Sequence, residues 1–152
     1  MTEPDHGAET LDVPTAQEAV LTVMRLFRVL ERVDTGLTPQ QYRILKLAGA
    51  GGERSARLAE RLAVAKPTLT ATADALVAAG YAQREAEAGD RRVVRLCLTA
   101  AGRAALERAD AAYADWFGPL LGATGDVAGV LEAFRGLDAA MDERRRARRG
   151  AA

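Results

Sequence analysis

In one segment of this chain of 152 residues, the spacing of apolar residues departs from that of a helix. Val94, Leu96 and Leu98 alternate with Arg95 and Cys97, which is the period of two that a half-buried strand requires. On both sides of this segment, apolar residues recur every three or four positions, as they do on amphipathic helices. The pattern therefore predicts a mainly α fold that carries a small β-hairpin.

Helix-end signals divide the first third of the chain. Residues 1–14 show little periodicity, and we expect them to form a flexible tail. Capping boxes at Thr15–Glu18 and Thr38–Gln41 predict two helices. The first helix should run to about Asp34 and the second to about Ala48.

Two shorter helices and the hairpin follow in the middle of the chain. Ser55 can cap a short helix, and a further helix begins near Pro67. The two strands are expected at residues 81–85 and 92–99, with the polar turn 86–90 between them.

The last third of the chain predicts two long helices. Thr99 caps the first, which should end at about Phe117, before Pro119. The second begins near Val127 with heptad-like spacing and ends in the arginine run 144–149. These arginines are read as cations that suit a helix C-terminus, in preference to a nucleic-acid contact.

The composition argues against several classes of protein. One cysteine, Cys97, excludes an internal disulfide, and a single histidine, His6, leaves no usual set of zinc ligands. No apolar run approaches the roughly 20 residues that span a bilayer, and the polar start lacks a secretory signal. No nucleophile triad or phosphate loop is found. We therefore expect a cytoplasmic protein that is not an enzyme and has no cofactor and no metal.

Charge is distributed unevenly, although the net charge is zero. Residues 38–102 carry ten basic and six acidic side chains, whereas residues 1–37 carry three basic and seven acidic ones. A basic segment between neutral or acidic flanks is typical of a DNA-contacting module. An excess of this size is also common by chance, so charge alone does not carry the argument.

Residues 37–102 resemble the winged helix-turn-helix of the MarR (multiple-antibiotic-resistance regulator) family. The resemblance rests on four segments, LTPQQYRILKLA (37–48), SARLAERLAVAKPTLTATADALVAAG (55–80), YAQREAEAGDRR (81–92) and VVRLCLTAAG (93–102). Their order, their spacing, the Asp-Arg-Arg of the hairpin and the closing Leu-Thr-x-x-Gly are specific in combination. The resemblance implies a single compact domain, in which dimerisation helices at 15–36 and 103–149 flank the DNA-binding lobe.

The second helix of a helix-turn-helix lies in the major groove. Helical spacing places Thr68, Thr70 and Ala71 on the side away from Leu69, where they can meet base edges or phosphates. Lys66 stands at the start of this helix, near an expected phosphate. The family often has an arginine where this chain has Ala71, and its absence removes ~1–3 kcal/mol of base discrimination. Taken alone, such a threonine-rich face is as readily a solvated surface.

The hairpin turn carries the sharpest local motif. By resemblance, Arg92 enters the minor groove, Asp90 orients it through a charge-assisted pair, and Arg91 meets a phosphate. The sequence does not settle which arginine takes which role, and a charged turn by itself usually serves solubility. The backbone amides of Ser55 to Arg57 are expected to bind a phosphate. Arg84 and Arg95, on the strands, are weaker candidates for phosphate contacts.

These inferences predict a dimeric regulator of transcription, more often a repressor, that binds double-stranded DNA at a palindrome of ~16–20 base pairs. Exposed apolar stripes on the flanking helices favour a homodimer. The resemblance also implies a small phenolic or aromatic effector, with Arg25, Arg28 and Tyr42 near its pocket. Two alternatives remain, a winged-helix protein-interaction module and a nonspecific architectural DNA binder.

Overall fold

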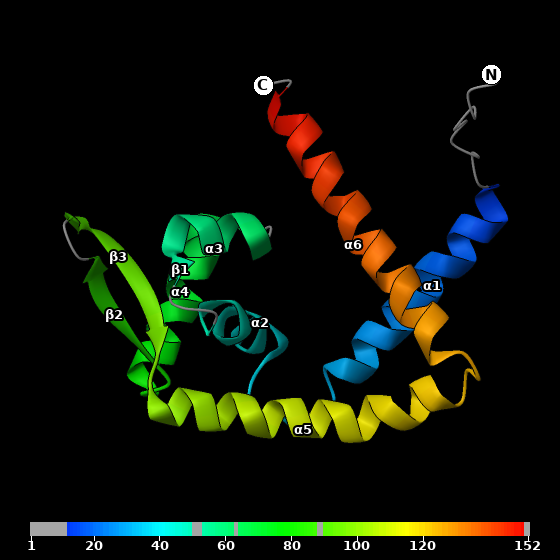
Figure 1. The fold of residues 1–152 in the computed structure, drawn as a ribbon, viewed down its shortest axis with the longest axis horizontal. Coiled ribbons are helices and arrows are strands. Elements are labelled where there is room, and N and C mark those ends of the chain that lie inside the picture. Colours follow the sequence, from blue (N-terminus) through cyan, green and yellow to red (C-terminus); the bar gives the residue numbers. More distant parts are fainter. Residues whose placement is uncertain (1–11, 50–52, 63, 88–89, 151–152) are drawn as a thin grey trace.

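The computed structural model describes residues 12–49, 53–62, 64–87 and 90–150. The elements in chain order are α1 (Val13–Leu30), α2 (Pro39–Ala48), β1 (Glu53–Arg54), α3 (Ser55–Leu62), α4 (Lys66–Ala78), β2 (Ala82–Glu87), β3 (Asp90–Leu98), α5 (Ala100–Gly122) and α6 (Val127–Gly150). In Figure 1, α5 runs along one edge, with a lobe formed by α2, α3, α4 and the strands at one end and α1 at the other. This confirms the predicted fold class.

The start of α2 is fixed by the predicted capping box. Thr38 Oγ1 accepts a hydrogen bond from the Gln41 backbone N–H (3.2 Å), and the Gln41 side chain accepts one from the Thr38 backbone N–H (2.9 Å). Pro39 follows at the first helical position, where a missing N–H removes no helical bond. A cap of this kind stabilises a helix by about 1 kcal/mol.

The hydrophobic core lies inside the lobe. The helices α2, α3, α4 and α5 and the strands β2 and β3 all contribute to it, so these six elements pack around one centre. Each leucine-sized side chain buried in this way contributes about 1.5–3 kcal/mol. The largest fully buried side chains are Ile44, Leu45, Leu58, Leu76 and Leu96.

A third strand, which the sequence did not predict, joins the hairpin. The strand β3 lies between β1 and β2 and pairs antiparallel with both. In β1, Glu53 is paired with Leu96 and Arg54 with Arg95. Two residues are too few to show an alternating pattern, so β1 could not be recognised from apolar periodicity. Its pairing ties the start of α3 to the hairpin.

Both ends of α1 differ from the prediction. The helix begins at Val13 with Asp12 as its N-cap, so Thr15 lies inside the first turn and the predicted Thr15–Glu18 capping box is wrong. A proline in the first turn allows this earlier start, because its missing N–H has no helical partner there. The helix ends at Leu30 instead of continuing to about Asp34.

The helix α5 begins as predicted and ends later than predicted. Thr99 Oγ1 accepts a hydrogen bond from the Gly102 N–H (3.0 Å), which confirms Thr99 as the cap. The helix continues beyond Phe117 to Gly122 with Pro119 inside it. A proline leaves one carbonyl without its helical donor. The surface around Pro119 is exposed, so water can reach that carbonyl.

Gly102, the last residue of the Leu-Thr-x-x-Gly segment, lies against the backbone that leads into β2. A Cβ atom at this position would overlap the carbonyl oxygen of Tyr81 and lie 2.8 Å from its carbonyl carbon. The same Tyr81 oxygen accepts a hydrogen bond from the Thr99 N–H (3.1 Å). Glycine is therefore required for this close approach between α5 and the lobe.

We expect Gly102→Ala to lower the free energy of unfolding by about 1–3 kcal/mol, because the added methyl group forces backbone apart. Urea unfolding followed by circular dichroism measures this change. Gly136→Ala in α6 is the control, since no atom lies within 4 Å of its added Cβ. The control should gain about 0.5–1 kcal/mol. Equal stability of the two variants would contradict the packing role of Gly102.

Candidate nucleic-acid interface and ligand pocket

The helix α4 presents a polar face on the surface of the lobe. Lys66, Thr68, Thr70 and Ala71 are exposed, as the helical spacing predicted. The opposite face buries Leu69, Ala73 and Leu76. The N-cap residue, Ala65, offers no side-chain hydrogen bond, so the first N–H groups of α4 have no side-chain cap. The start of α4 thus combines uncapped backbone donors with a lysine.

Two threonine hydroxyls on α4 already donate to their own helix. Thr70 Oγ1 donates to the Lys66 carbonyl (3.0 Å), and Thr72 Oγ1 donates to the Thr68 carbonyl (2.9 Å). The Thr70 oxygen keeps its lone pairs and can accept a hydrogen bond from a donor outside the protein. Helical spacing alone does not reveal that the Thr70 hydroxyl is left mainly as a hydrogen-bond acceptor.

An ion pair joins α4 to the hairpin. Arg84 Nη2 lies 2.6 Å from Asp74 Oδ1, with side chains that are 41 % and 55 % exposed. A pair with this exposure contributes ~0–1 kcal/mol, so its main effect is to direct the guanidinium group. A phosphate contact by Arg84, the weaker prediction, would have to share that group with Asp74.

The hairpin of β2 and β3 extends away from the core of the lobe (Figure 1). Its ladder changes register between Ala86 and Glu87, and irregularities of this kind increase local twist. Arg57 is exposed on α3. The predicted residues Asp90, Arg91 and Arg92 are the first three of β3, and Ser55 is the first of α3, but their side chains lie outside the described part of the structure.

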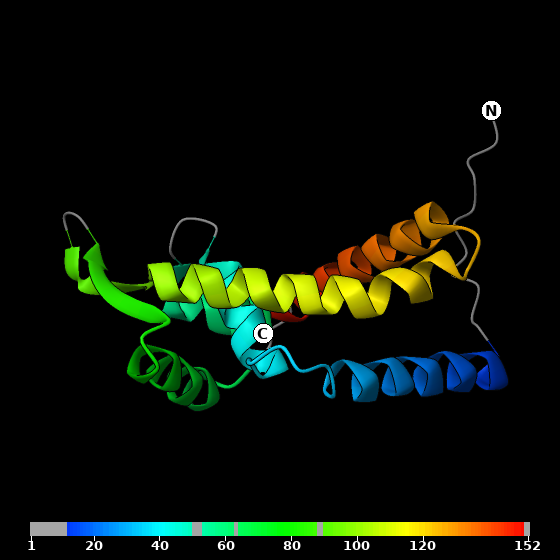
Figure 2. The same ribbon diagram turned by 90° about the horizontal axis from the view of Figure 1, so that it is seen from below.

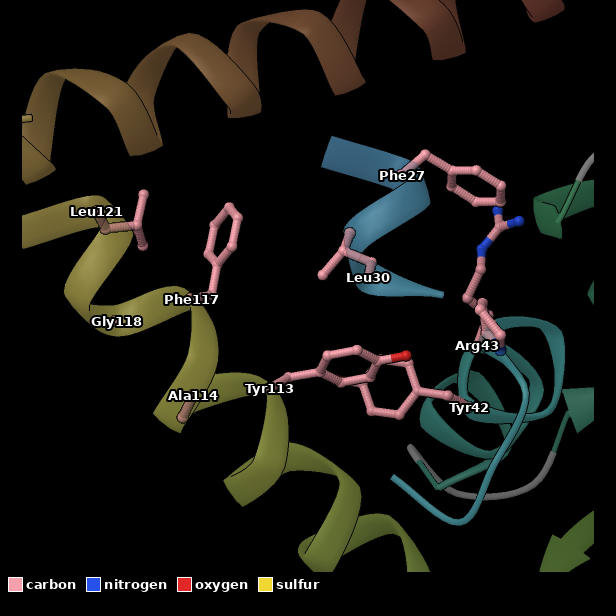
Figure 3. Close-up of a pocket in the computed structure, with 10 residues that line it drawn as sticks. Phe27, Leu30, Tyr42, Arg43, Tyr113, Ala114, Phe117, Gly118 and Leu121 are labelled. Atoms are coloured by element: carbon pink, nitrogen blue, oxygen red, sulfur yellow. The ribbon is translucent and has the colours of Figure 1, made fainter. Parts of the chain in front are cut away.

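A cavity of about 710 Å³ is bordered by residues of α1, α2 and α5. Figure 3 shows Leu30 from α1, Tyr42 from α2 and Phe117 from α5 around the same space. The rings of Tyr42 and Tyr113 meet edge to face, with centroids 4.9 Å apart. The volume is within the usual range for a small-molecule site, and most of the lining is aromatic or aliphatic. The cavity is therefore suited to an apolar, aromatic molecule.

A polar cluster of Tyr42, Lys46 and Asp110, named the Asp110 cluster below, adjoins this cavity and links α2 to α5. Tyr42 Oη donates to Asp110 Oδ1 (2.7 Å), while Lys46 Nζ donates to Oδ1 (2.8 Å) and Oδ2 (2.7 Å). Burial raises the pKa of Tyr42, and the hydrogen bond to Asp110 raises it further. Burial alone would raise the pKa of Asp110, but the bonds from Lys46 and Tyr42 outweigh it and lower that pKa.

Of the three predicted effector residues, only Tyr42 lines this cavity. Arg25 and Arg28 line a separate pocket of about 320 Å³ along α1. The structure therefore does not bring the two arginines together with Tyr42. The aromatic residues Phe27 and Phe117 do line the cavity, and helical periodicity identified them only as apolar positions.

Large apolar side chains are exposed along α1 and α6. No residue of α1 is buried. In Figure 2, α1 and the first part of α6 lie on opposite sides of α5. Large exposed apolar side chains that gather on a surface mark a site of contact with another protein. The exposed residues are Val20, Leu21, Val23, Met24 and Phe27 on α1, and Val127, Leu131, Phe134, Leu137 and Met141 on α6.

Three further observations on the described residues concern metal ligands, membrane-spanning helices and the thiol of Cys97. Among them, no group of three or more histidine, cysteine, aspartate or glutamate side chains could hold a metal ion. No helix in the same ranges has the length and apolar character needed to cross a bilayer. Burial, followed by a hydrogen bond with Glu85, raises the pKa of the Cys97 thiol, which disfavours the reactive thiolate.

Known proteins are similar to this chain in its central sequence and in most of its fold. Residues 35–93 match the family model of the MarR family. The transcriptional regulator MOSR of Mycobacterium tuberculosis, solved in complex with DNA, is 26% identical with a TM-score of 0.65, covering 86% of this chain and 97% of its own. No curated protein matches this chain in sequence.

Two further structures are similar in fold. The transcriptional regulator BldR of Sulfolobus solfataricus is 24% identical with a TM-score of 0.72, covering 88% of this chain and 99% of its own. Wild-type MarR of E. coli is 21% identical with a TM-score of 0.69, covering 84% of this chain and 98% of its own.

The family match includes α2, α3, α4 and most of the hairpin, which together carry the exposed polar face of α4. The structural similarity extends over most of the chain, beyond that match. The central part of this chain is therefore similar to the MarR family, and the chain has a winged helix-turn-helix fold.

Proposed function

We propose that this protein is a homodimeric transcriptional regulator that binds specific sites on double-stranded DNA. The observation that carries the proposal is the exposed polar face of α4, held in place by the buried Leu69, Ala73 and Leu76 in a lobe that is similar to the MarR family. The DNA complex of MOSR, which has the same fold, supports DNA as the partner.

On this proposal, α4 enters the major groove and the backbone at its start faces a phosphate. Lys66 contacts the phosphate, while Thr68 and Thr70 face base edges. Because the Thr70 hydroxyl donates to Lys66, its oxygen accepts from the amino group of adenine or cytosine. The Ala71 methyl group fits against a thymine methyl. It discriminates between base pairs less strongly than an arginine side chain would.

The hairpin supplies the second DNA contact. Arg91 and Arg92, at the start of β3, carry positive charge to the far end of the hairpin, where a minor groove would pass. Asp90 orients one of the two arginines through a charge-assisted pair. Ser55 and Arg57, at the start of α3, add phosphate contacts that position the lobe.

The dimer is assigned to residues 15–36 and 103–149, which flank the DNA-binding lobe at residues 37–102. In the described part of the chain no side chain of α1 is fully buried, and apolar residues of α6 such as Phe134 and Leu137 are exposed as well. A second copy that covers both stripes removes this apolar surface from water, at about 25 cal/mol per Å². A two-fold dimer presents two α4 helices about one DNA turn apart, so its target is a palindrome. Binding there blocks transcription.

The cavity beside Tyr42 is the proposed effector site. Its lining favours an aromatic molecule, and Arg43 at its wall can pair with an acidic group such as the carboxylate of a phenolic acid. The ring of Tyr42 forms part of the wall, and its hydroxyl is held by Asp110 on α5. A molecule that displaces this ring alters how the lobe sits on α5, and thereby the spacing between the two α4 helices.

Selection of bound sequences from a randomised DNA pool, at physiological salt, tests the proposed function. We expect enrichment of a palindrome with half-sites one helical turn apart, because the dimer fixes that spacing. Salt-sensitive binding without enrichment would indicate an architectural DNA binder instead. Absence of binding at any salt concentration would indicate a protein-interaction module.

Two substitutions at the start of β3 test the DNA-facing surface, by measuring the affinity of each variant for the selected site. Arg92→Ala should weaken binding to the selected site by at least tenfold while the protein stays folded, because the groove contact is lost. Asp90→Ala should weaken it less. Unchanged affinity of Arg92→Ala would remove Arg92 from the interface.

The dimer is tested by Phe134→Asp, which places a charge in the apolar stripe of α6. We expect this variant to be monomeric, because burying an unpaired carboxylate is strongly unfavourable. Size-exclusion chromatography with light scattering measures the mass. Ala139→Asp, on the exposed surface of α6 away from Phe134, is the matched control and should remain dimeric. A dimer in both variants would exclude this stripe as the interface.

The effector site is tested by Ala114→Phe, which places a ring in the cavity that Ala114 lines. We expect the variant to bind DNA like the unmodified protein and to lose any release of DNA by a panel of phenolic acids. Ala111→Phe, at an exposed position of α5 outside that lining, should keep the response. A response that survives in Ala114→Phe, or no response in the unmodified protein, would argue against this site.

A further inference from the structure

The basic C-terminal end of α6 lies against the DNA-binding lobe. Arg145 Nη1 donates to the backbone carbonyl of Arg61 in α3 (3.4 Å) and pairs with Asp142 (3.2 Å). Arg146 and Glu60, one from each element, line a narrow cleft of about 150 Å³ at this contact. Arg145 thus anchors the last turns of α6 beside the lobe.

The anchor point lies near the DNA-binding surface. Arg61 is in the last turn of α3, which ends at Leu62, and α4 begins at Lys66. In Figure 1, the C-terminal end of α6 lies on the same side of α5 as α3 and the far ends of β2 and β3. DNA bound across α4 and the hairpin therefore approaches the side of the molecule on which α6 ends.

The charge of this helix end exceeds what helix stability explains. Residues 144–149 contain five arginines and no acidic residue. A cation near a helix C-terminus contributes about 0.3–1 kcal/mol, which accounts for one or two of them. Arg144 and Arg148 are both exposed and stand four residues apart, an arrangement of like charges that destabilises a helix. An anionic partner would offset this repulsion.

We propose that Arg144 and Arg148 bind phosphates of the DNA that α4 contacts, as a second and sequence-independent contact surface. They share one face of α6. Arg145, the neighbour of Arg144 in sequence, holds this part of the helix beside the lobe. Duplex DNA carries a negative charge about every 1.7 Å, so arginines can bind it without reading a base. The inference rests on the proposed function and extends it to α6.

The test compares the unmodified protein with Arg144→Gln/Arg148→Gln, using the full chain and a duplex that contains the selected site. The logarithm of the binding constant is plotted against that of the salt concentration. Each lost phosphate contact should reduce the slope by about 0.9, so the double variant should lose about 2 per protomer. The ratio of affinities for the selected and a scrambled duplex should stay constant, because phosphate contacts carry no sequence information.

Arg148→Gln and Arg108→Gln form the matched pair, because each removes one exposed arginine and Arg108 lies on α5. Only Arg148→Gln should reduce the slope, and light scattering should show the same mass for all variants. An unchanged slope in the double variant, or a loss of site discrimination, overturns the inference while the proposed function stands. If the unmodified protein binds no DNA, both the proposed function and this inference fail.

Discussion

The hydrogen bonds of the Asp110 cluster hold the DNA-binding lobe against α5. They join α5 to two residues of α2 that are 64 and 68 positions away in sequence. Because its two partners lower the pKa of Asp110, the carboxylate is charged at neutral pH and the link persists. Lys46 and Asp110 are partly exposed, so the cluster gives orientation more than stability. Together with the contact of Gly102 and Tyr81, it sets the direction in which α4 and the hairpin face.

Much of the lobe could be predicted because its signals are local in sequence. The capping box at Thr38 involves residues three positions apart, and the alternation around Leu96 lies within one strand. Helical spacing also separated the buried Leu69 from the exposed Thr68 and Thr70. In each case a short segment determines its own geometry, so the local sequence is sufficient to predict the structure of that segment.

The remaining features depend on contacts between distant segments. The strand β1 forms only because β3 is beside it, and the cavity exists only where α1, α2 and α5 meet. In the sequence, Asp110 is one polar residue of a predicted helix. Its contacts with Tyr42 and Lys46 become visible only in the folded structure. Arg25 and Arg28 were grouped with Tyr42 by resemblance, and the structure places them in a different pocket. The periodicity of the sequence contains no information about these contacts between distant segments.

The isolation of α1 has a consequence for how such a regulator responds to its own abundance. A helix of 18 residues with no buried side chain is only marginally stable in water by itself. In the proposed dimer, contacts with the second copy supply the free energy that orders α1. The fraction of chains with an ordered α1 and the dimeric fraction therefore increase together with protein concentration. At low abundance, occupancy of a DNA site would then follow the square of the chain concentration. Such a dependence turns a modest change in synthesis rate into a threshold for gene control.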